Sequence, residues 1–318
     1  MIGIIKLVAK RLGFGLVTLF IVSLIIFWAV EALPGNLAEQ VLGQAATPET
    51  VEALSKEMGL DRPAFVRYID WLSSALQGDF GSSLANKRSV SEQLEPRFFN
   101  TMFLAGLAAA MSIPISIILG VLAALWRDSI FDRGANVVTL TSISSPEFFL
   151  GYILILFLAV QNPIFPSISN VSEGMTLGER TFATMLPAIT LTLVVIAHMM
   201  RMTRAAIIAL LASPYIEMAR LKGEPRWKII VVHALPNALA PVINVVALNL
   251  AYLITGVVLV EIVFVYPGVG QLLVDSVQKR DFPVVQACCL IFAATYILLN
   301  LLADVGAILS NPRLRHPK

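Results

Sequence analysis

Charge and cysteine are both scarce in this sequence of 318 residues. Asp, Glu, Lys and Arg make up 14% of the chain, whereas an ordinary soluble domain has about 25%. Hydrophobic residues make up 57%, and the mean hydropathy is +0.81. This number of charged residues is too small to cover a water-exposed surface. The composition therefore excludes a soluble globular enzyme and a disordered protein. The net charge of +2 is too small to indicate nucleic-acid binding.

Residues that bind metals or perform catalysis are also rare. The two cysteines, Cys288 and Cys289, are adjacent within an apolar run, where we interpret them as small packing residues. The three histidines are far apart, and no carboxylate or cysteine spacing joins them into a metal site. The sequence contains no Gly-x-x-x-x-Gly-Lys-Ser/Thr, Gly-x-Ser-x-Gly or His-Glu-x-x-His motif. We therefore expect this chain to have no catalytic residue and to bind no metal or cofactor.

Long apolar runs between charged residues predict membrane-spanning helices. Between Arg11 and Glu31 lie 19 uncharged residues, and between Lys228 and Glu261 lie 32. A helix of about 20 residues crosses a bilayer core of about 30 Å. The runs lack the alternating polarity of outer-membrane barrel strands, and the first run is longer than the apolar part of a signal peptide. The sequence predicts an all-α integral membrane protein with six spans, near residues 12–31, 100–126, 136–160, 183–203, 234–260 and 283–306.

The distribution of Lys and Arg predicts the orientation of the chain. With the N-terminus inside the cell, the inner segments carry fourteen Lys and Arg residues and the two short outer loops carry three. Both termini are therefore predicted to be cytoplasmic. The expected parts are a first span with its N-terminus at 1–31, an extracytoplasmic loop domain at 32–99, a five-helix core at 100–306 that includes a cytoplasmic loop at 204–233, and a cytoplasmic tail at 307–318.

The extracytoplasmic segment is predicted to be a small helical domain. Pro48 begins one predicted helix, which ends near Glu57, and residues 63–76 form another. One face of the second helix is apolar and carries Phe65, Ile69, Leu72 and Leu76.

Glu147 is the one acidic residue predicted to lie at some depth within a span. It follows Ser145-Pro146, where a helix must break or bend. Because an ionisable group in a membrane is costly, Glu147 is a candidate residue of a translocation path. The alternative is that Glu147 sits at the kink and is held by backbone groups that the proline leaves unpaired. The lack of other intramembrane charge disfavours an ion-coupled secondary carrier, which stays as the alternative class.

The cytoplasmic loop contains a predicted short amphipathic helix. Ser213-Pro214 predicts its start and Gly223 its end. The cationic side carries Arg220 and Lys222, and the apolar side carries Tyr215, Met218 and Ala219. Such a helix can occupy a groove in a cytoplasmic partner. An amphipathic connector lying on lipid headgroups is the alternative.

This loop resembles the EAA loop of ABC importer permeases, whose consensus is Glu-Ala-Ala, three residues, Gly, nine residues and Ile-x-Leu-Pro. The sequence has Glu217-Met218-Ala219, Gly223 and His233-Ala234-Leu235-Pro236 at the same spacing, which matches five specified positions. Met218 and His233 depart from the consensus. Histidine at the latter position is common in the dipeptide/oligopeptide (DppB/OppB-like) branch of the family.

Other segments also resemble that branch, so the resemblance covers nearly the whole chain. They are Leu33-Pro34-Gly35, Met58 to Pro63, Gly78-Asp79-Phe80-Gly81, Tyr266 to Gly270, Arg280-Asp281-Phe282-Pro283 and Asn311-Pro312-Arg313.

The resemblance implies a type I ABC importer permease in a bacterial or archaeal cytoplasmic membrane. Such a chain forms half of a pore, and a second homologous permease forms the other half. Two cytoplasmic ATPase subunits or domains bind ATP and Mg²⁺, and an extracytoplasmic binding protein delivers the substrate. The implied cargo is a dipeptide or oligopeptide, with nickel, an opine, glutathione or a glycoside as alternatives. The resemblance assigns contact with the ATPases to Tyr215, Glu217, Ala219, Arg220, Lys222 and Gly223.

The segment from Tyr266 to Gly270 is predicted to lie outside the membrane. It is a candidate contact for the binding protein. The alternative is a Pro-Gly turn that packs on the extracytoplasmic loop.

Overall fold

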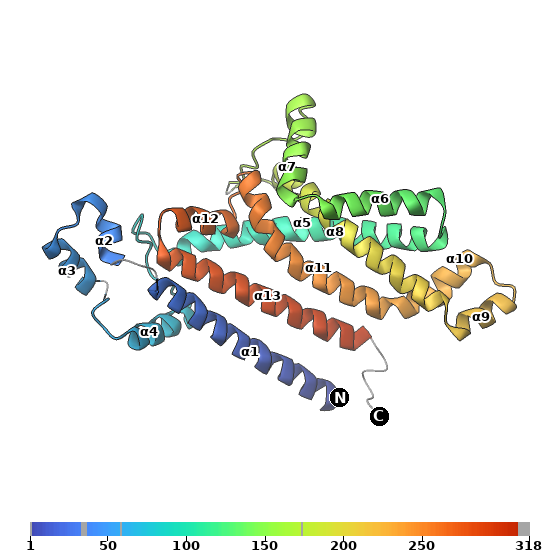
Figure 1. The fold of residues 1–318 in the computed structure, drawn as a ribbon, viewed down its shortest axis with the longest axis horizontal. Coiled ribbons are helices and arrows are strands. Elements are labelled where there is room, and N and C mark those ends of the chain that lie inside the picture. The colour runs from blue at the N-terminus through green and yellow to red at the C-terminus, as the bar shows by residue number, and fades with distance from the viewer. Residues whose placement is uncertain (1, 33–36, 58, 173, 311–318) are drawn as a thin grey trace. The chain divides into compact units, whose positions relative to one another are not determined.

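The computed structural model describes residues 2–32, 37–57, 59–172 and 174–310. These residues form helices and loops, with one isolated bridge between Ser82 and Ser89 and no named strand (Figure 1). The helices are α1 (Ile2–Glu31), α2 (Leu37–Leu42), α3 (Pro48–Glu57), α4 (Ala64–Leu76), α5 (Val90–Leu125), α6 (Ile130–Ser144), α7 (Glu147–Ile155), α8 (Leu177–Leu211), α9 (Pro214–Leu221), α10 (Arg226–Lys228), α11 (Leu235–Val263), α12 (Val269–Gln278) and α13 (Phe282–Ser310). A 3₁₀ turn covers Gly43–Ala45, and π-helical segments cover Leu156–Gln161 and Ile229–Ala234.

The predicted all-α membrane fold is confirmed. Five segments among the described residues are long and apolar enough to span a bilayer: Val8–Glu31, Val90–Leu125, Leu177–Leu211, Val242–Val263 and Phe282–Gly306. A bent pair of helices provides a sixth span if it is counted as one. The helix α8 has 35 residues, or about 50 Å of rise, so it extends well beyond an apolar core of about 30 Å.

The span predicted near residues 136–160 is a broken helix. Helix α6 ends at Ser144, α7 begins at Glu147, and the two are bent by 105°. Pro146 has no backbone N–H and forces Ser145 into an extended conformation, with ψ at 133°. Figure 1 shows α7 turning sharply away from α6. The predicted break at Ser145-Pro146 is therefore present, and its angle is large enough to redirect the chain.

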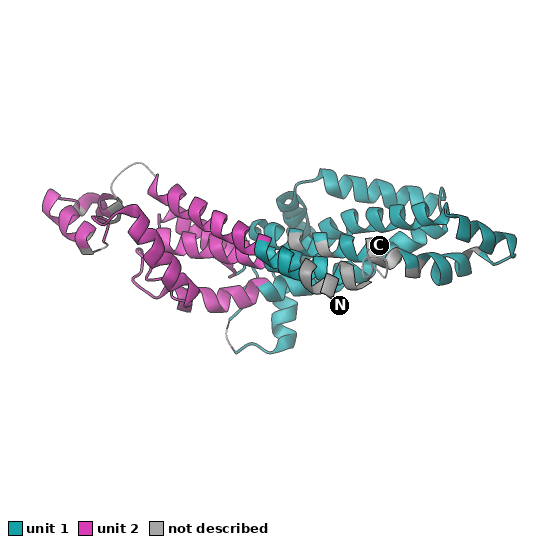
Figure 2. Cartoon of the chain, turned by 90° about the horizontal axis from the view of Figure 1, so that it is seen from below, with its two compact units in different colours: residues 1–13, 102–266, 296–318 teal, residues 14–101, 267–295 magenta. Residues whose placement is uncertain are grey.

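The chain divides into two compact units (Figure 2). Unit 1 comprises residues 1–13, 102–266 and 296–318, and unit 2 comprises residues 14–101 and 267–295. One buried cluster of unit 1 consists of Ala124, Ile207, Ile216, Ala219, Ile229, Ile230, Ala234 and Val242. One buried cluster of unit 2 consists of Val90, Leu94, Val269, Leu272, Val284, Ala287 and Cys288. Each cluster joins segments that are far apart in the sequence.

The two helices predicted between residues 48 and 76 correspond to α3 and α4, whereas α2 and α12 were not predicted. The motif at 33–35, residue Met58 and the Asn311-Pro312-Arg313 motif lie outside the described residues.

Candidate coupling helix and translocation-path residues

Helix α9 begins and ends at the residues that the sequence indicates. Ser213 occupies the position before the helix and Pro214 its first position. The Ser213 hydroxyl does not cap α9, because it donates to the Leu210 carbonyl of the preceding helix. Figure 1 shows α9 and α10 at the turn between α8 and α11.

Gly223 ends α9 in a left-handed conformation, with φ at +80°. The Gly223 N–H donates to the Arg220 carbonyl at 2.9 Å, and the Glu224 N–H donates to the Ala219 carbonyl at 3.3 Å. These are the two hydrogen bonds of a Schellman motif, in which glycine is preferred because it has no Cβ. A Cβ on Gly223 would meet no atom of the described residues within 4 Å, apart from its two chain neighbours. The requirement for glycine within the chain is therefore conformational.

One side of α9 is anchored to the helix bundle. Ile216 and Ala219 are buried in the unit 1 cluster, which also contains Ile207 of α8 and Val242 of α11. The Tyr215 hydroxyl donates to the carbonyl of His233 at 3.4 Å. This hydrogen bond links α9 to the His233-Ala234-Leu235-Pro236 part of the EAA-like motif. Helix α9 therefore shares one buried cluster with residues of two long helices, α8 and α11.

The opposite side of α9 is exposed. Its exposed residues are Tyr215, Glu217, Met218, Arg220, Leu221, Lys222 and Gly223. Of the three residues on the predicted apolar side, Tyr215 and Met218 are exposed, whereas Ala219 packs against the bundle. Ile216, which the sequence analysis did not single out, provides the larger buried anchor. The exposed side consequently combines apolar side chains with two cations.

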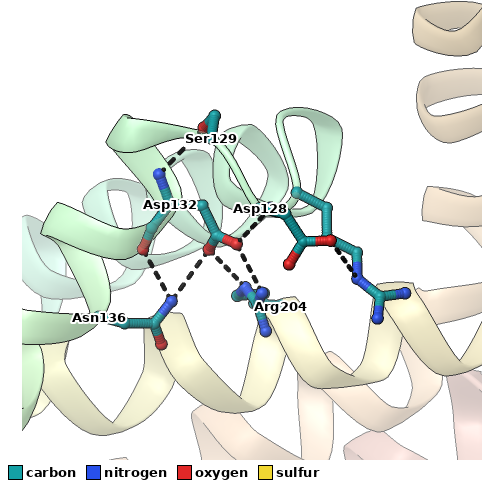
Figure 3. A network of polar contacts seen from close by, with 6 residues as sticks. Asp128, Ser129, Asp132, Asn136 and Arg204 are labelled. Carbon is teal, nitrogen blue, oxygen red and sulfur yellow. Dashed lines mark hydrogen bonds and ion pairs between the residues drawn. The ribbon is translucent and has the colours of Figure 1, made fainter.

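An ion pair joins α6 to α8 (Figure 3). The Arg204 guanidinium donates to both carboxylate oxygens of Asp132, at 2.7 and 2.6 Å. Asn136 donates to the same carboxylate at 2.9 Å, and so does the backbone N–H of Asp128 at 2.9 Å. Ser129 caps α6 by accepting from the Asp132 N–H. The pair was not identified from the sequence, although charges near apolar helix segments commonly pair with one another.

Glu147 lies where α7 approaches α11. The Tyr252 hydroxyl donates to one Glu147 oxygen, Oε1. The other oxygen, Oε2, is buried without a hydrogen-bond partner among the described residues. A Cβ on Gly256 would lie 3.2 Å from Oε2, so the glycine leaves space for the carboxylate. The His198 ring of α8 lies beside Tyr252, with the ring centroids 6.2 Å apart.

The segment from Tyr266 to Gly270 is packed along α5. The Asn100 side chain donates to the Pro267 carbonyl at 2.9 Å, and the Val269 N–H donates to Thr101 Oγ1 at 2.9 Å. Tyr266 is fully buried, and this burial raises the pKa of its phenol above the ordinary range. The arrangement favours a packing role for this turn over a surface contact with a binding protein.

In unit 2, Asp281 of one segment that resembles the family contacts the loop directly after another such segment. The Ser83 hydroxyl donates to the Asp281 carboxylate, and the Leu84 N–H donates to Asp281 Oδ1 at 3.0 Å. Asp281 is buried immediately before α13. It therefore anchors the loop that follows Gly78-Asp79-Phe80-Gly81.

Comparison with known proteins identifies the family. Residues 116–316 match the model of the binding-protein-dependent transport system inner membrane component, and residues 4–105 match the N-terminal model of the same transport-system membrane components. Glutathione transport system permease proteins from Escherichia coli K12 and Shigella dysenteriae serotype 1 are each 36% identical to the chain over 309 residues, covering 97% of this chain and 98% of theirs. The chain therefore belongs to the binding-protein-dependent transport system inner membrane components, as a multi-pass permease subunit of an ABC importer.

Proposed function

We propose that α9 is the element through which cytoplasmic ATPases drive this permease. The observation that carries the proposal is that one side of α9 is buried and the opposite side is exposed. Ile216 and Ala219 anchor the helix to the bundle, whereas Met218, Arg220 and Leu221 are exposed. A mixed apolar and cationic helix face is suited to a groove in a partner protein. In this proposal ATP and Mg²⁺ are bound by the ATPases and hydrolysis takes place there.

The anchored side of α9 provides the route for coupling. Closure of the ATPases displaces α9, and the buried contacts of Ile216 transmit the displacement to α8 and α11. The Schellman turn at Gly223 keeps the end of α9 compact against the partner surface. Glu217 and Lys222 lie on the exposed side, where they can pair with charges of the ATPase.

In the assembly that we propose, a second homologous permease completes the pore and an extracytoplasmic binding protein delivers the cargo. Both termini of the chain are cytoplasmic, so α9 lies on the same side of the membrane as the ATPases. The excess of Lys and Arg in the inner segments supports this orientation.

The proposed cargo is a short peptide. Support comes from the motifs of the dipeptide/oligopeptide branch and from the relatives whose name is glutathione permease. Glutathione is itself a small peptide and is therefore the first compound to test. Nickel, an opine and a glycoside are the other candidates.

Glu147 is the proposed contact for cargo within the translocation path. Its carboxylate combines a hydroxyl donor from Tyr252 with a second oxygen that has no protein partner among the described residues. A carboxylate in such surroundings can attract the protonated amino group of a peptide. The redirected chain at the α6–α7 bend brings this group against α11.

Purification of the tagged chain from its native membrane in mild detergent tests the assembly. Mass spectrometry is expected to identify a second permease, ATPases and a binding protein. The binding protein is then tested with glutathione, dipeptides, opines and nickel. A stable preparation of this chain without any ATPase would contradict the proposal and favour an ion-driven carrier.

A further inference from the structure

Helix α4 has an apolar stripe that faces away from the protein. Phe65, Ile69, Leu72 and Leu76 recur at helical spacing on one face. Phe65 is 67% exposed, Ile69 47% and Leu76 81%. In a soluble domain such a stripe would face the core. Here the buried residue of α4 is Tyr68, which lies on an adjacent face.

Tyr68 fixes α4 to the membrane-spanning part of α1. The hydroxyl groups of Tyr68 and Ser23 are 2.8 Å apart in a buried hydrogen bond. The Tyr68 ring lies edge-on to Phe27, with the ring centroids 5.4 Å apart, and to Phe20, at 6.3 Å. Trp71, one turn further along α4, also lies against Phe27, at 6.2 Å. The contact is therefore made by several packed rings.

The position of this contact along α1 determines the depth of α4. Ser23 precedes Glu31, the first charge after the apolar run, by eight residues, which corresponds to about 12 Å of helix rise. Tyr68 therefore reaches well inside the boundary that Glu31 marks. Arg67, the neighbour of Tyr68, pairs with Glu31 at 2.5 Å. Consequently α4 has a charged contact at the aqueous edge of α1 and an aromatic contact below it.

The spanning helix that α4 contacts also carries exposed apolar side chains. Phe20 touches Tyr68 and is still 50% exposed, and Ile25 and Trp28 of α1 are exposed as well. Only 11% of the spanning window of α1 is buried in this chain. Polar groups lie on the other exposed side of α4, where Asp70 pairs with Arg62 at 2.7 Å. This division between apolar and polar faces is typical of a helix that lies in the membrane interface.

We propose that α4 is an interfacial helix and that lipid acyl chains, at the bilayer surface near the carboxyl end of α1, cover Phe65, Ile69 and Leu76. Lipid is favoured over a protein partner because α4 contacts a spanning helix whose own apolar side chains are exposed. A stripe of four side chains is also much smaller than the area of about 800 Å² that each partner buries in a stable protein interface. The proposal does not depend on the identity of the cargo.

Spin labels on α4 test the proposal in the complete transporter, reconstituted in nanodiscs of phosphatidylethanolamine and phosphatidylglycerol. In a Cys288→Ala, Cys289→Ala background, single labels are attached at Phe65→Cys and Leu76→Cys. Ser73→Cys, which is exposed on the polar side of the same helix, is the matched control. Ile25→Cys on α1 provides the lipid reference. Uptake by each labelled transporter, measured separately in proteoliposomes, verifies that the assembly is intact.

The measurement compares collisions of each label with oxygen, which concentrates in lipid, and with a nickel chelate, which stays in water. The oxygen-to-nickel ratio is expected to be several-fold higher at positions 65 and 76 than at position 73, and close to the ratio at position 25. A ratio at 65 and 76 as low as that at 73 would place the stripe in water and overturn the proposal. Labels at 65 and 76 that neither reagent reaches would also overturn it, because a protein partner would then cover the stripe.

Discussion

Gly223 allows a sharp test of the coupling proposal. Its φ of +80° lies in the left-handed region, where a residue with a Cβ costs about 1–2 kcal/mol. Asparagine tolerates this conformation better than other residues with side chains. Because no atom of the described residues, apart from the two chain neighbours, lies within 4 Å of a Cβ at Gly223, an added side chain finds space there. Gly223→Asn therefore adds bulk at the turn with little backbone strain, whereas Gly223→Val adds bulk and strain.

Gly78 provides a matched control. Its φ is +82°, and a Cβ added at this position would meet no atom within 4 Å in the part of the chain that the structure describes, its two chain neighbours aside. It also ends a helix in a Schellman motif, because its N–H donates to the Ala75 carbonyl at 3.0 Å and the Asp79 N–H donates to the Ser74 carbonyl at 3.0 Å. Gly78→Asn and Gly78→Val thus repeat the backbone perturbation in a loop that is predicted to lie on the opposite side of the membrane.

The assay measures ATP hydrolysis and cargo uptake together in proteoliposomes. Both Gly223 variants are expected to insert and assemble but to lose uptake relative to ATP hydrolysis, because the added side chain collides with the ATPase surface. Gly78→Asn is expected to keep both activities. Loss of uptake in Gly223→Val but not in Gly223→Asn would assign the effect to the backbone conformation instead. Normal uptake by Gly223→Val would refute the role of this turn in coupling.

Three further predictions concern buried polar groups. Arg204→Met leaves Asp132 without its cation and is expected to destabilise the fold by about 3 kcal/mol, measured as a lower midpoint of thermal unfolding. The double variant with Asp132→Asn should regain part of the lost stability. An unchanged midpoint in Arg204→Met would contradict a stabilising role for this ion pair. Glu147→Gln keeps the shape of the side chain and is expected to reduce uptake without changing assembly, so normal transport would exclude Glu147 from the path. Asp281→Ala removes the acceptor of the Ser83 hydroxyl and of the Leu84 N–H and should cost about 1–3 kcal/mol. Faster proteolysis of the adjoining loop is expected, and unaltered proteolysis would argue against the anchor.

Local signals in the sequence determined where most of the helices lie. The charged residues bracketed the apolar runs, because burying a charge in a bilayer is costly. Pro146 marked the break between α6 and α7 because proline has no backbone N–H to donate within a helix. Gly223 marked the end of α9 because glycine adopts the left-handed conformation without steric cost. The motif around Glu217 indicated the ABC importer permeases, and the family comparisons confirmed that family.

The faces of these helices, in contrast, were decided by tertiary structure. In a membrane protein lipid is as apolar as the core, so hydrophobic periodicity does not say which side of a helix is buried. The stripe of α4 accordingly faces outward. In the cytoplasmic helix α9, Ile216 rather than Tyr215 is the anchor because Ile216 is the side chain that packs in the buried cluster with α8 and α11 residues. Asp281 and Ser83 are separated by 198 residues, and only the packing of unit 2 brings them together. A hydrogen bond or ion pair over such a separation depends on the complete path of the chain, which no local pattern contains.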